Sequence, residues 1–156
     1  MSIETRRALP TDCETIAEFN QLLAWETEDK SLDGEVLRCG VAALLADTHK
    51  GVYYLAESAG QVVGQAMITR EWSDWRNGWM WWLQSVYVRA ESRRCGVFSA
   101  LFEQILNEAR ADGSVIGLRL YVEQGNHTAQ AVYRRYGLEE IPYQIFQRWP
   151  LDLVES

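Results

Sequence analysis

The sequence predicts an α+β (mixed α/β) fold in which helices lie on the faces of a central sheet. Two observations predict it: β-branched and aromatic runs of strand length interleave with segments of helical apolar spacing, and turn-forming residues separate the two kinds of segment. The predicted order is β-α-α-β-β-β-α-β-α-β. A chain of 156 residues suits a single domain, 1–156, because it is long enough for one core and short for two.

The first part of the chain predicts one strand and two helices. Residues 3–9 alternate imperfectly and end at a proline, which favours a short strand. Thr11 or Asp12 can cap the helix that follows, and a second helix is predicted over residues 34–46. The segment 25–33 between the helices is polar, and we expect it to be a loop.

The middle of the chain predicts three consecutive strands. Residues 51–58 and 62–72 are β-rich runs on either side of a short glycine-containing turn, as in a β-hairpin. After a longer turn over residues 73–78, residues 79–88 form a strongly apolar run that is typical of a strand buried on both faces.

The last part of the chain predicts two helices and two strands. A helix begins after Gly96 and ends near residues 112–113, and the run 115–122 is a buried type of strand. A short helix is expected within residues 126–137, and residues 143–149 are expected to form a final strand.

Composition narrows the class of function. The net charge of −7, from 15 basic and 22 acidic residues, argues against a nucleic-acid partner and suits a small cationic one. No apolar stretch is long enough to span a membrane, and the N-terminal residues lack the apolar core of a signal peptide, so we expect a cytoplasmic protein. Cys13, Cys39 and Cys95 show no metal-ligand spacing, and we expect reduced thiols and no metal.

A candidate anion site lies within QSVYVRAESRRCGVFSALF, residues 84–102. Arg93, Arg94 and Gly96 crowd the point where a helix begins, and a helix start carries unpaired N–H groups and partial positive charge. Neither a P-loop nor a dinucleotide fingerprint is present. A tight turn with solvated arginines is the alternative, but two guanidiniums, a glycine and an acid-free first turn together favour a pyrophosphate or a similar polyanion.

Two motifs resemble a known family. VYVRAESRRCGVFSAL resembles motif A of the GNAT superfamily of acyl-CoA-dependent N-acetyltransferases, [QR]xxGx[GA], with Arg93 and Gly96 in register and Phe98 in place of the last small residue. NHTAQAVYRRYGL resembles the family's NxxAxxxYxxxGF segment, with Leu138 in place of Phe. The matching residues there are Asn126, Ala129, Tyr133 and Gly137. RRALPTDCETIAEF is similar to the family's first strand and helix, so the resemblance spans nearly the whole chain.

The resemblance implies a GNAT fold with acetyl-CoA as cosubstrate. That fold has a central mixed, mostly antiparallel sheet of about six strands, splayed at the CoA site and flanked by about four helices. The pyrophosphate would lie on main-chain amides between Arg93 and Phe98, and the pantetheine arm along residues 86–88, where one N–H would hold the oxyanion. The implied cofactor-binding residues are Val86, Tyr87, Val88, Arg93, Arg94, Cys95, Gly96, Val97, Phe98, Asn126 and Tyr133.

Tyr133 matches the family's tyrosine beside the sulfur, which makes it the expected general acid, since a phenol is protonated at neutral pH. A core aromatic is the alternative, and the register with Asn126 and Gly137 favours catalysis. Glu71, at the end of a strand, is the candidate general base, acting directly or through a water. An exposed glutamate without a catalytic role is an equally good interpretation of Glu71.

Acceptor specificity is expected from two polar aromatic segments. Glu26, Glu28, Trp72, Asp74 and Trp75 are candidates for an aromatic, acidic pocket that binds an ammonium group. Gln84 is a further candidate for substrate binding. It either orders the water through which Glu71 would act or is a satisfied structural residue. A core or dimer-interface role is the alternative for several of the tryptophans.

The predicted function is transfer of an acetyl group from acetyl-CoA to a primary amine of a small molecule or amino acid, by direct attack on the thioester. The alternatives are a non-catalytic acyl-CoA-binding sensor and an acetyltransferase that acts on a protein lysine or N-terminus. The tryptophan-rich surface and family habit suggest a homodimer. The acceptor, the acyl chain preference and the pathway stay open.

Overall fold

Five strands and four α-helices make up the computed structural model, which describes residues 2–152. The strands are β1 (Ile3–Arg7), β2 (Val52–Ser58), β3 (Gln61–Ser73), β4 (Gly78–Val88) and β5 (Val115–Arg119). The helices are α1 (Cys13–Glu28), α2 (Gly34–Leu45), α3 (Val97–Ala111) and α4 (His127–Arg135). Single 3-10 turns, η1 (Pro10–Asp12) and η2 (Ala90–Ser92), precede α1 and α3.

The strands form one mixed sheet whose spatial order, β1-β2-β3-β4-β5, is also their order in the sequence. The pairs from β1 to β4 are antiparallel, whereas β4 and β5 are parallel and are connected through α3. Ala59 and Gly60 both have positive φ, 51° and 76°, as the tight turn of the β2–β3 hairpin requires. The predicted mixed, mostly antiparallel sheet is confirmed, with five strands in place of about six.

The predicted final strand is wrong. Residues 143–149 form no strand, and no other strand of the described chain pairs with them. The apolar side chains that produced the prediction are exposed, among them Tyr143, Ile145, Phe146 and Trp149. Alternation of apolar and polar residues shows that a segment could line one face of a sheet. A strand also needs a neighbouring strand to pair with its N–H and C=O groups.

Helix α1 is longer than the sequence predicts. The polar composition of residues 25–33 predicts a loop, but residues 25–28 complete the last turn of α1. The helix ends where Asp29 adopts the left-handed conformation (φ 52°) and donates its N–H to Trp25 O at 3.1 Å. An exposed last helical turn has the same polar composition as a loop, so composition alone does not distinguish the two. The structure places Glu26 on a helix.

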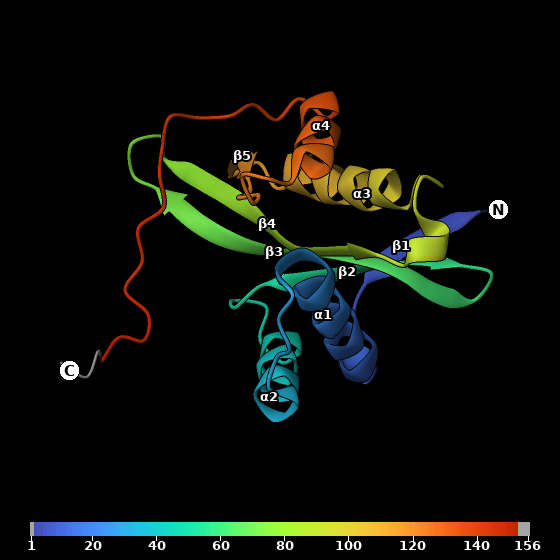
Figure 1. The fold of residues 1–156 in the computed structure, drawn as a ribbon. Coiled ribbons are helices and arrows are strands. Elements are labelled where there is room, and N and C mark those ends of the chain that lie inside the picture. The colour runs from blue at the N-terminus through green and yellow to red at the C-terminus, as the bar shows by residue number, and fades with distance from the viewer. Residues whose placement is uncertain (1, 153–156) are drawn as a thin grey trace. The chain divides into compact units, whose positions relative to one another are not determined.

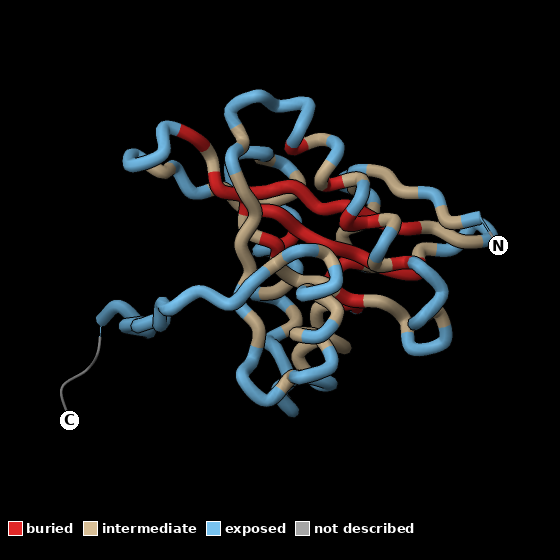
Figure 2. The backbone as a smooth tube through the Cα atoms, turned by 90° about the horizontal axis from the view of Figure 1, so that it is seen from above, coloured by how far each residue is buried: buried red, intermediate tan, exposed pale blue. Residues whose placement is uncertain are grey.

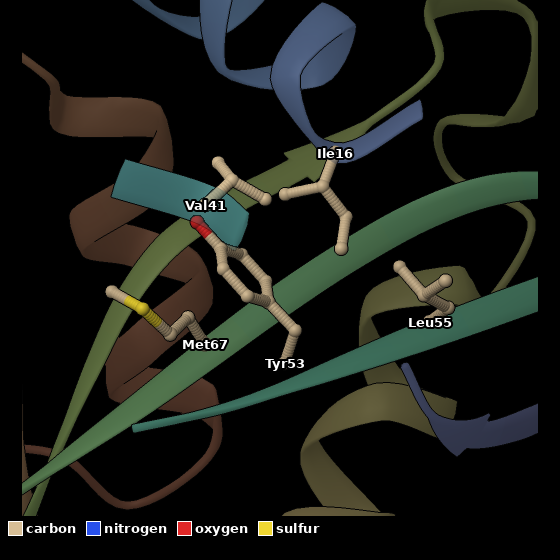
Figure 3. Close-up of a cluster of buried hydrophobic side chains, with 5 residues drawn as sticks. All are labelled: Ile16, Val41, Tyr53, Leu55 and Met67. Carbon is tan, nitrogen blue, oxygen red and sulfur yellow. The ribbon is translucent and has the colours of Figure 1, made fainter. Parts of the chain in front are cut away.

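Helices α1 and α2 cover one face of the sheet and α3 covers the other (Figure 1). Buried residues gather along the central strands (Figure 2). On the α1/α2 face the core cluster consists of Ile16, Val41, Tyr53, Leu55 and Met67 (Figure 3). The buried stripe of α3 consists of Val97, Leu101, Phe102, Ile105 and Ala109. Each large aliphatic side chain removed from water in this way stabilises the fold by roughly 1.5–3 kcal/mol.

A polar cluster fastens α3 to the sheet. Glu108 Oε2 accepts from Arg7 Nη2 at 2.6 Å and from the Tyr54 hydroxyl at 2.7 Å, and its other oxygen accepts from Gln104 Nε2 at 2.8 Å. Partial burial acts to raise the pKa of Glu108, but the hydrogen bonds outweigh it and hold that pKa below its ordinary value. Burial, and then the bond to Glu108, raise the pKa of Tyr54.

The chain divides into two compact units. The first ends at Tyr121 and contains the whole sheet with α1, α2 and α3, and the second begins at Val122 and contains α4. Gly137, with φ 83°, follows α4 as a left-handed residue, so the predicted helix within residues 126–137 is confirmed. Among residues 2–152 no helix combines the length and the apolar character that a membrane crossing demands.

Candidate active site

The pairing between strands β4 and β5 ends midway along β4. Their parallel pairing ends at Trp82 and Arg119, and β5 ends there as well. Beyond Trp82, the described part of the chain pairs β4 with β3 only. An open strand edge presents N–H and C=O groups that can take an extended ligand as an added strand. The opening includes residues 86–88, along which the family resemblance implies a pantetheine arm.

A β-bulge interrupts β4 within this open stretch. The register with β3 steps from Gln65–Tyr87 to Met67–Gln84, so β4 has one residue more than β3 at this point. Ser85 has a φ of 48°, a left-handed conformation that costs a non-glycine residue on the order of 1–2 kcal/mol. Backbone strain of this kind clusters at functional sites.

The segment that follows β4 folds into an anion loop, defined here as residues 93–96. Arg94 and Gly96 are both left-handed, with φ of 61° and 83°, and Gly96 is the N-cap of α3. No side chain caps α3, and its first turn has no acidic residue. A loop of this shape can leave main-chain N–H groups free at the N-terminus of α3, the positive end of the helix dipole, which is the geometry of an anion site.

Gly64 sets the position of the start of α3 against the sheet. A Cβ at Gly64 would lie 2.6 Å from Val97 Cγ1 and 3.2 Å from Tyr87 O, so only glycine permits this approach. The side chain of Val97 is therefore used for packing. The Phe98 ring stacks on Phe102 with 5.6 Å between centroids, which keeps its bulk along α3.

The structure brings together Glu26, predicted to bind the acceptor, and Arg93, predicted to bind the cofactor. Arg93 Nη2 pairs with Glu26 Oε2, Arg93 Nε donates to Val88 O at 3.0 Å, and the guanidinium carbon lies 5.7 Å from the centroid of the Tyr87 ring. The Tyr87 hydroxyl donates to Glu26 Oε1 at 3.3 Å. Burial, and then the charge of Glu26, raise the pKa of Tyr87. The last turn of α1 is thus joined to the anion loop.

Glu71 lies farther along β3. Its Oε2 accepts from Trp82 Nε1 at 2.6 Å and is 3.5 Å from Arg119 Nη1. It is four positions along β3 from Met67, which pairs with Gln84 beside the bulge, and four positions span about 13 Å along a strand. The carboxylate therefore has partners of its own at the end of the parallel β4–β5 pairing.

The other acceptor candidates fall at two places, Trp72, Asp74 and Trp75 at the β3–β4 turn and Glu28 at the end of α1. Trp72 contacts Trp79 edge-on with 5.0 Å between centroids, and Asp74 Oδ1 accepts from the Trp75 N–H at 3.0 Å in the β3–β4 turn. Glu28 pairs with Lys30 at 2.7 Å. Residue 73 is eight positions along β3 from the residue that pairs with Tyr87, roughly 26 Å at the rise of a strand. The structure does not gather these residues into one pocket with Glu26.

Three further predicted residues have identifiable contacts or environments. Gln84 Nε2 donates across the strands to Thr69 Oγ1 at 2.8 Å. In the second unit, Asn126 Oδ1 caps α4 by accepting from Ala129 N at 3.1 Å. Burial raises the pKa of the Tyr133 phenol, which keeps it protonated at neutral pH. Among residues 2–152, no group of three or more His, Cys, Asp or Glu side chains is placed to hold a metal ion.

A sequence profile of the Acetyltransferase (GNAT) family matches residues 16–138, which is most of the chain. The chain belongs to the GNAT family. The family resemblance and fold class predicted from the sequence are thereby confirmed, and the prediction of an acyltransferase agrees with this family.

Several GNAT relatives match the chain. An L-methionine sulfoximine/L-methionine sulfone acetyltransferase from Pseudomonas aeruginosa is 34% identical over 107 residues, which cover 64% of this chain and 59% of the relative. The crystal structure of a possible acetyltransferase from Clostridium difficile 630 is 45% identical, covers 99% of this chain and 100% of its own, and has a TM-score of 0.89. A predicted acetyltransferase from Clostridium acetobutylicum, solved with acetyl-CoA, shares the fold with a TM-score of 0.77 at 19% identity, over 94% of this chain and 96% of its own.

Sequence reasoning about this GNAT chain missed two polar residues beside the bulge, Gln65 and Asn20. Gln65 is fully buried in β3, and Asn20 lies on α1 within hydrogen-bond distance of it. A glutamine inside the apolar run VVGQAMI was the available signal, because a buried polar side chain needs hydrogen-bond partners.

Proposed function

We propose that this GNAT protein transfers an acetyl group from acetyl-CoA to a primary amine of a small molecule or amino acid. The observation that carries the proposal is the continuity of the open β4 edge with the anion loop. Beyond Trp82, β4 pairs on one side only within residues 2–152, and the chain then leads through η2 into the loop that begins at Arg93. A pantetheine arm and a diphosphate, which are adjacent in CoA, would thus have adjacent sites.

The roles at the cosubstrate site follow from this continuity. Main-chain amides around Gly96 and the start of α3 bind the diphosphate, and Arg93 and Arg94 add positive charge. One N–H of residues 86–88 polarises the thioester carbonyl and holds the oxyanion, a contribution typically worth about 10²–10³ in rate.

The chemistry needs two proton transfers. An aliphatic amine has a pKa of about 10.4, so it must lose a proton before its nitrogen attacks the thioester carbon. Glu71 is the proposed base. Because it lies about 13 Å along β3 from the residue that pairs with Gln84, it would act through a chain of waters rather than directly. As the C–S bond breaks, Tyr133 donates its phenolic proton to the departing thiolate, a role supported by the raised pKa of its phenol.

The acceptor is proposed to be a small amine or amino acid. The P. aeruginosa relative is named for L-methionine sulfoximine and L-methionine sulfone, which are amino acids. Glu26 at the end of α1, whose carboxylate pairs with Arg93 in this structure, is the proposed partner of the ammonium group. Glu28, Trp72, Asp74, Trp75 and Gln84 remain the further candidates for acceptor binding.

The setting is proposed to be the cytoplasm, with the protein as a homodimer. Cys13, Cys39 and Cys95 are all free thiols, as is usual in a reducing compartment. Trp25 and Trp75 are 60% and 86% exposed, and large exposed aromatic side chains favour an interface.

The test has two measurements. Calorimetry with CoA and acetyl-CoA should show binding, and an assay of free thiol released from acetyl-CoA should show turnover with at least one member of an amine panel that begins with L-methionine sulfoximine. Binding without turnover on any small amine or lysine peptide would favour the acyl-CoA sensor. Absence of binding at cellular concentrations of acetyl-CoA would remove the proposal altogether.

A further inference from the structure

We propose that Gln65 and Asn20 are positioning residues that fix the direction of Val86 N–H, the one of the proposed oxyanion donors that follows the bulge. This inference rests on the proposed acetyl transfer and assigns a specific atom to it. It is carried by a chain of hydrogen bonds that runs from the core beneath α1 to the bulge in β4.

The side chain of Gln65 holds the bulge through the main chain of Ser85. Its Nε2 donates to Ser85 O at 3.1 Å and to Asn20 Oδ1 at 2.8 Å. A main-chain carbonyl can only accept, so the nitrogen of the Gln65 amide must face Ser85, and the orientation of that amide is determined.

The hydrogen bond to Ser85 O also determines where the next N–H points. In a trans peptide, the C=O of one residue and the N–H of the following residue lie in one plane and point in opposite directions. With Ser85 O directed to Gln65, Val86 N–H is directed away from Gln65. The left-handed Ser85 (φ 48°) is strained, and the Gln65 bond opposes a rotation of this peptide that would relieve the strain.

Asn20 anchors the glutamine to the core. Its Nδ2 donates to the Tyr53 hydroxyl at 3.0 Å, and Tyr53 is 4% exposed within the core cluster (Figure 3). The chain therefore runs from Tyr53 on β2, through Asn20 on α1 and Gln65 on β3, to Ser85 on β4. Both amide side chains are held from two directions, as positioning requires.

The burial of the polar Gln65 side chain is energetically unfavourable, and the hydrogen bonds made by its Nε2 give a reason for a polar residue at this position. Outside the aromatic residues, Gln65 is the one buried side chain among residues 2–152 that is polar or charged. Its Oε1 has no hydrogen-bond partner among those residues, and an unpaired buried oxygen is unfavourable. An apolar residue of similar size would avoid this cost but would leave Ser85 O without its donor.

The first test reads the Val86 amide directly by NMR, with CoA and acetyl-CoA as the probes. The two ligands differ by the acetyl carbonyl, so we expect the Val86 N–H resonance to move downfield with acetyl-CoA relative to CoA. In Gln65→Leu this difference should shrink by at least about half, while the amides of the anion loop should respond to both ligands as in the wild type.

The second test is kinetic and uses the first amine that gives turnover. Gln65→Leu and Asn20→Ala should lower kcat by about ten- to a hundredfold, less than the loss of a whole oxyanion donor, with little change in the KM for acetyl-CoA. Tyr53→Phe keeps the Asn20–Gln65 contact and should lose less activity. Ile16→Val, a core change on the same face, should leave kcat unchanged. Gln65→Met, which preserves volume, repeats the test if Gln65→Leu unfolds.

The outcomes separate the two proposals. If neither ligand binds, the proposed function fails and this inference fails with it. If both bind and Val86 responds equally to CoA and acetyl-CoA, or if Gln65→Leu keeps the wild-type difference, only the assignment of Val86 and Gln65 is overturned.

Discussion

The guanidinium of Arg93 forms an ion pair with the carboxylate of Glu26, which joins the anion loop to the last turn of α1. The two side chains are 44% and 37% exposed, so the pair contributes at most about 1 kcal/mol to stability. The pair matters for binding because a diphosphate on the loop, as proposed, would compete with the carboxylate of Glu26 for Arg93.

Glu26→Gln is expected to strengthen the binding of CoA, because it frees Arg93 from its carboxylate partner. The gain should be a factor of up to about five and should shrink as salt is added. The same change should raise the KM for the amine. Calorimetry with CoA at two ionic strengths measures the first effect, and weaker CoA binding in the variant would contradict the competition.

Arg93→Ala is expected to weaken CoA by roughly 10- to 100-fold, because charge-assisted bonds to phosphate are lost. A pantetheine analogue without phosphates should lose far less. Arg110→Ala, in the last turn of α3, is the matched control and should leave both affinities unchanged. Equal losses for both ligands would show that Arg93 acts through packing.

Tyr133→Phe is expected to lower kcat by about 10²–10⁴ while CoA affinity stays the same. Burial raises the pKa of this phenol, so the wild type should keep its acid form, and the activity that depends on it, to a higher pH than an ordinary phenol would. The pH profile of kcat measures this, with Tyr136→Phe as the control. A variant that turns over at the wild-type rate would refute the role of Tyr133 as acid.

Glu108→Gln is expected to destabilise the fold by about 1–2 kcal/mol at pH 7, since Arg7 and Tyr54 lose a charged acceptor. The pKa of Glu108 is lowered on folding, so its contribution is present above its ordinary pKa of 4.5 and is lost as the pH falls through the folded value. Urea unfolding at pH 7 and pH 3 should show a difference between wild type and variant that shrinks in acid. Glu103→Gln, exposed on the same helix, should show no such difference at either pH.

Gly64→Ala is expected to cost about 1–3 kcal/mol of stability and to weaken CoA, because the added Cβ would displace Val97 and with it the start of α3. Gly40→Ala meets no neighbour within 4 Å inside α2 and should instead stabilise by about 0.5–1 kcal/mol. Thermal unfolding of the two variants gives the sign of each effect. Equal shifts would show that the approach of α3 to Gly64 is unimportant.

Local patterns were sufficient for most of the fold. Apolar spacing and turn residues located the helices and the five strands of the sheet, since each of these signals is contained in about ten neighbouring residues. Residues 25–28 and 143–149 were assigned wrongly for one reason. Whether a polar turn stays helical, or an alternating run finds a pairing partner, depends on surroundings that lie elsewhere in the chain.

The candidate site also has one part that a local pattern predicts and another part that no local pattern predicts. The anion loop is a contiguous segment, so Arg93, Arg94 and Gly96 could be singled out together from the sequence. The pairing of Glu26 with Arg93 joins residues 67 positions apart, and Gln65 reaches a main-chain carbonyl 20 positions away. Contacts of this kind are set by strand register and by the angle of α1, which no local pattern contains.

The agreement between sequence order and spatial order in the sheet bears on how the protein is made. When each strand from β2 to β5 leaves the ribosome, the strand that precedes it in the sheet has already been synthesised, so the sheet can grow outward from its N-terminal edge during synthesis. β5 is added last, after the α3 crossover. The ribosome should therefore have synthesised all of β1 to β4 before β4 and β5, the two parallel strands next to the open edge, can pair.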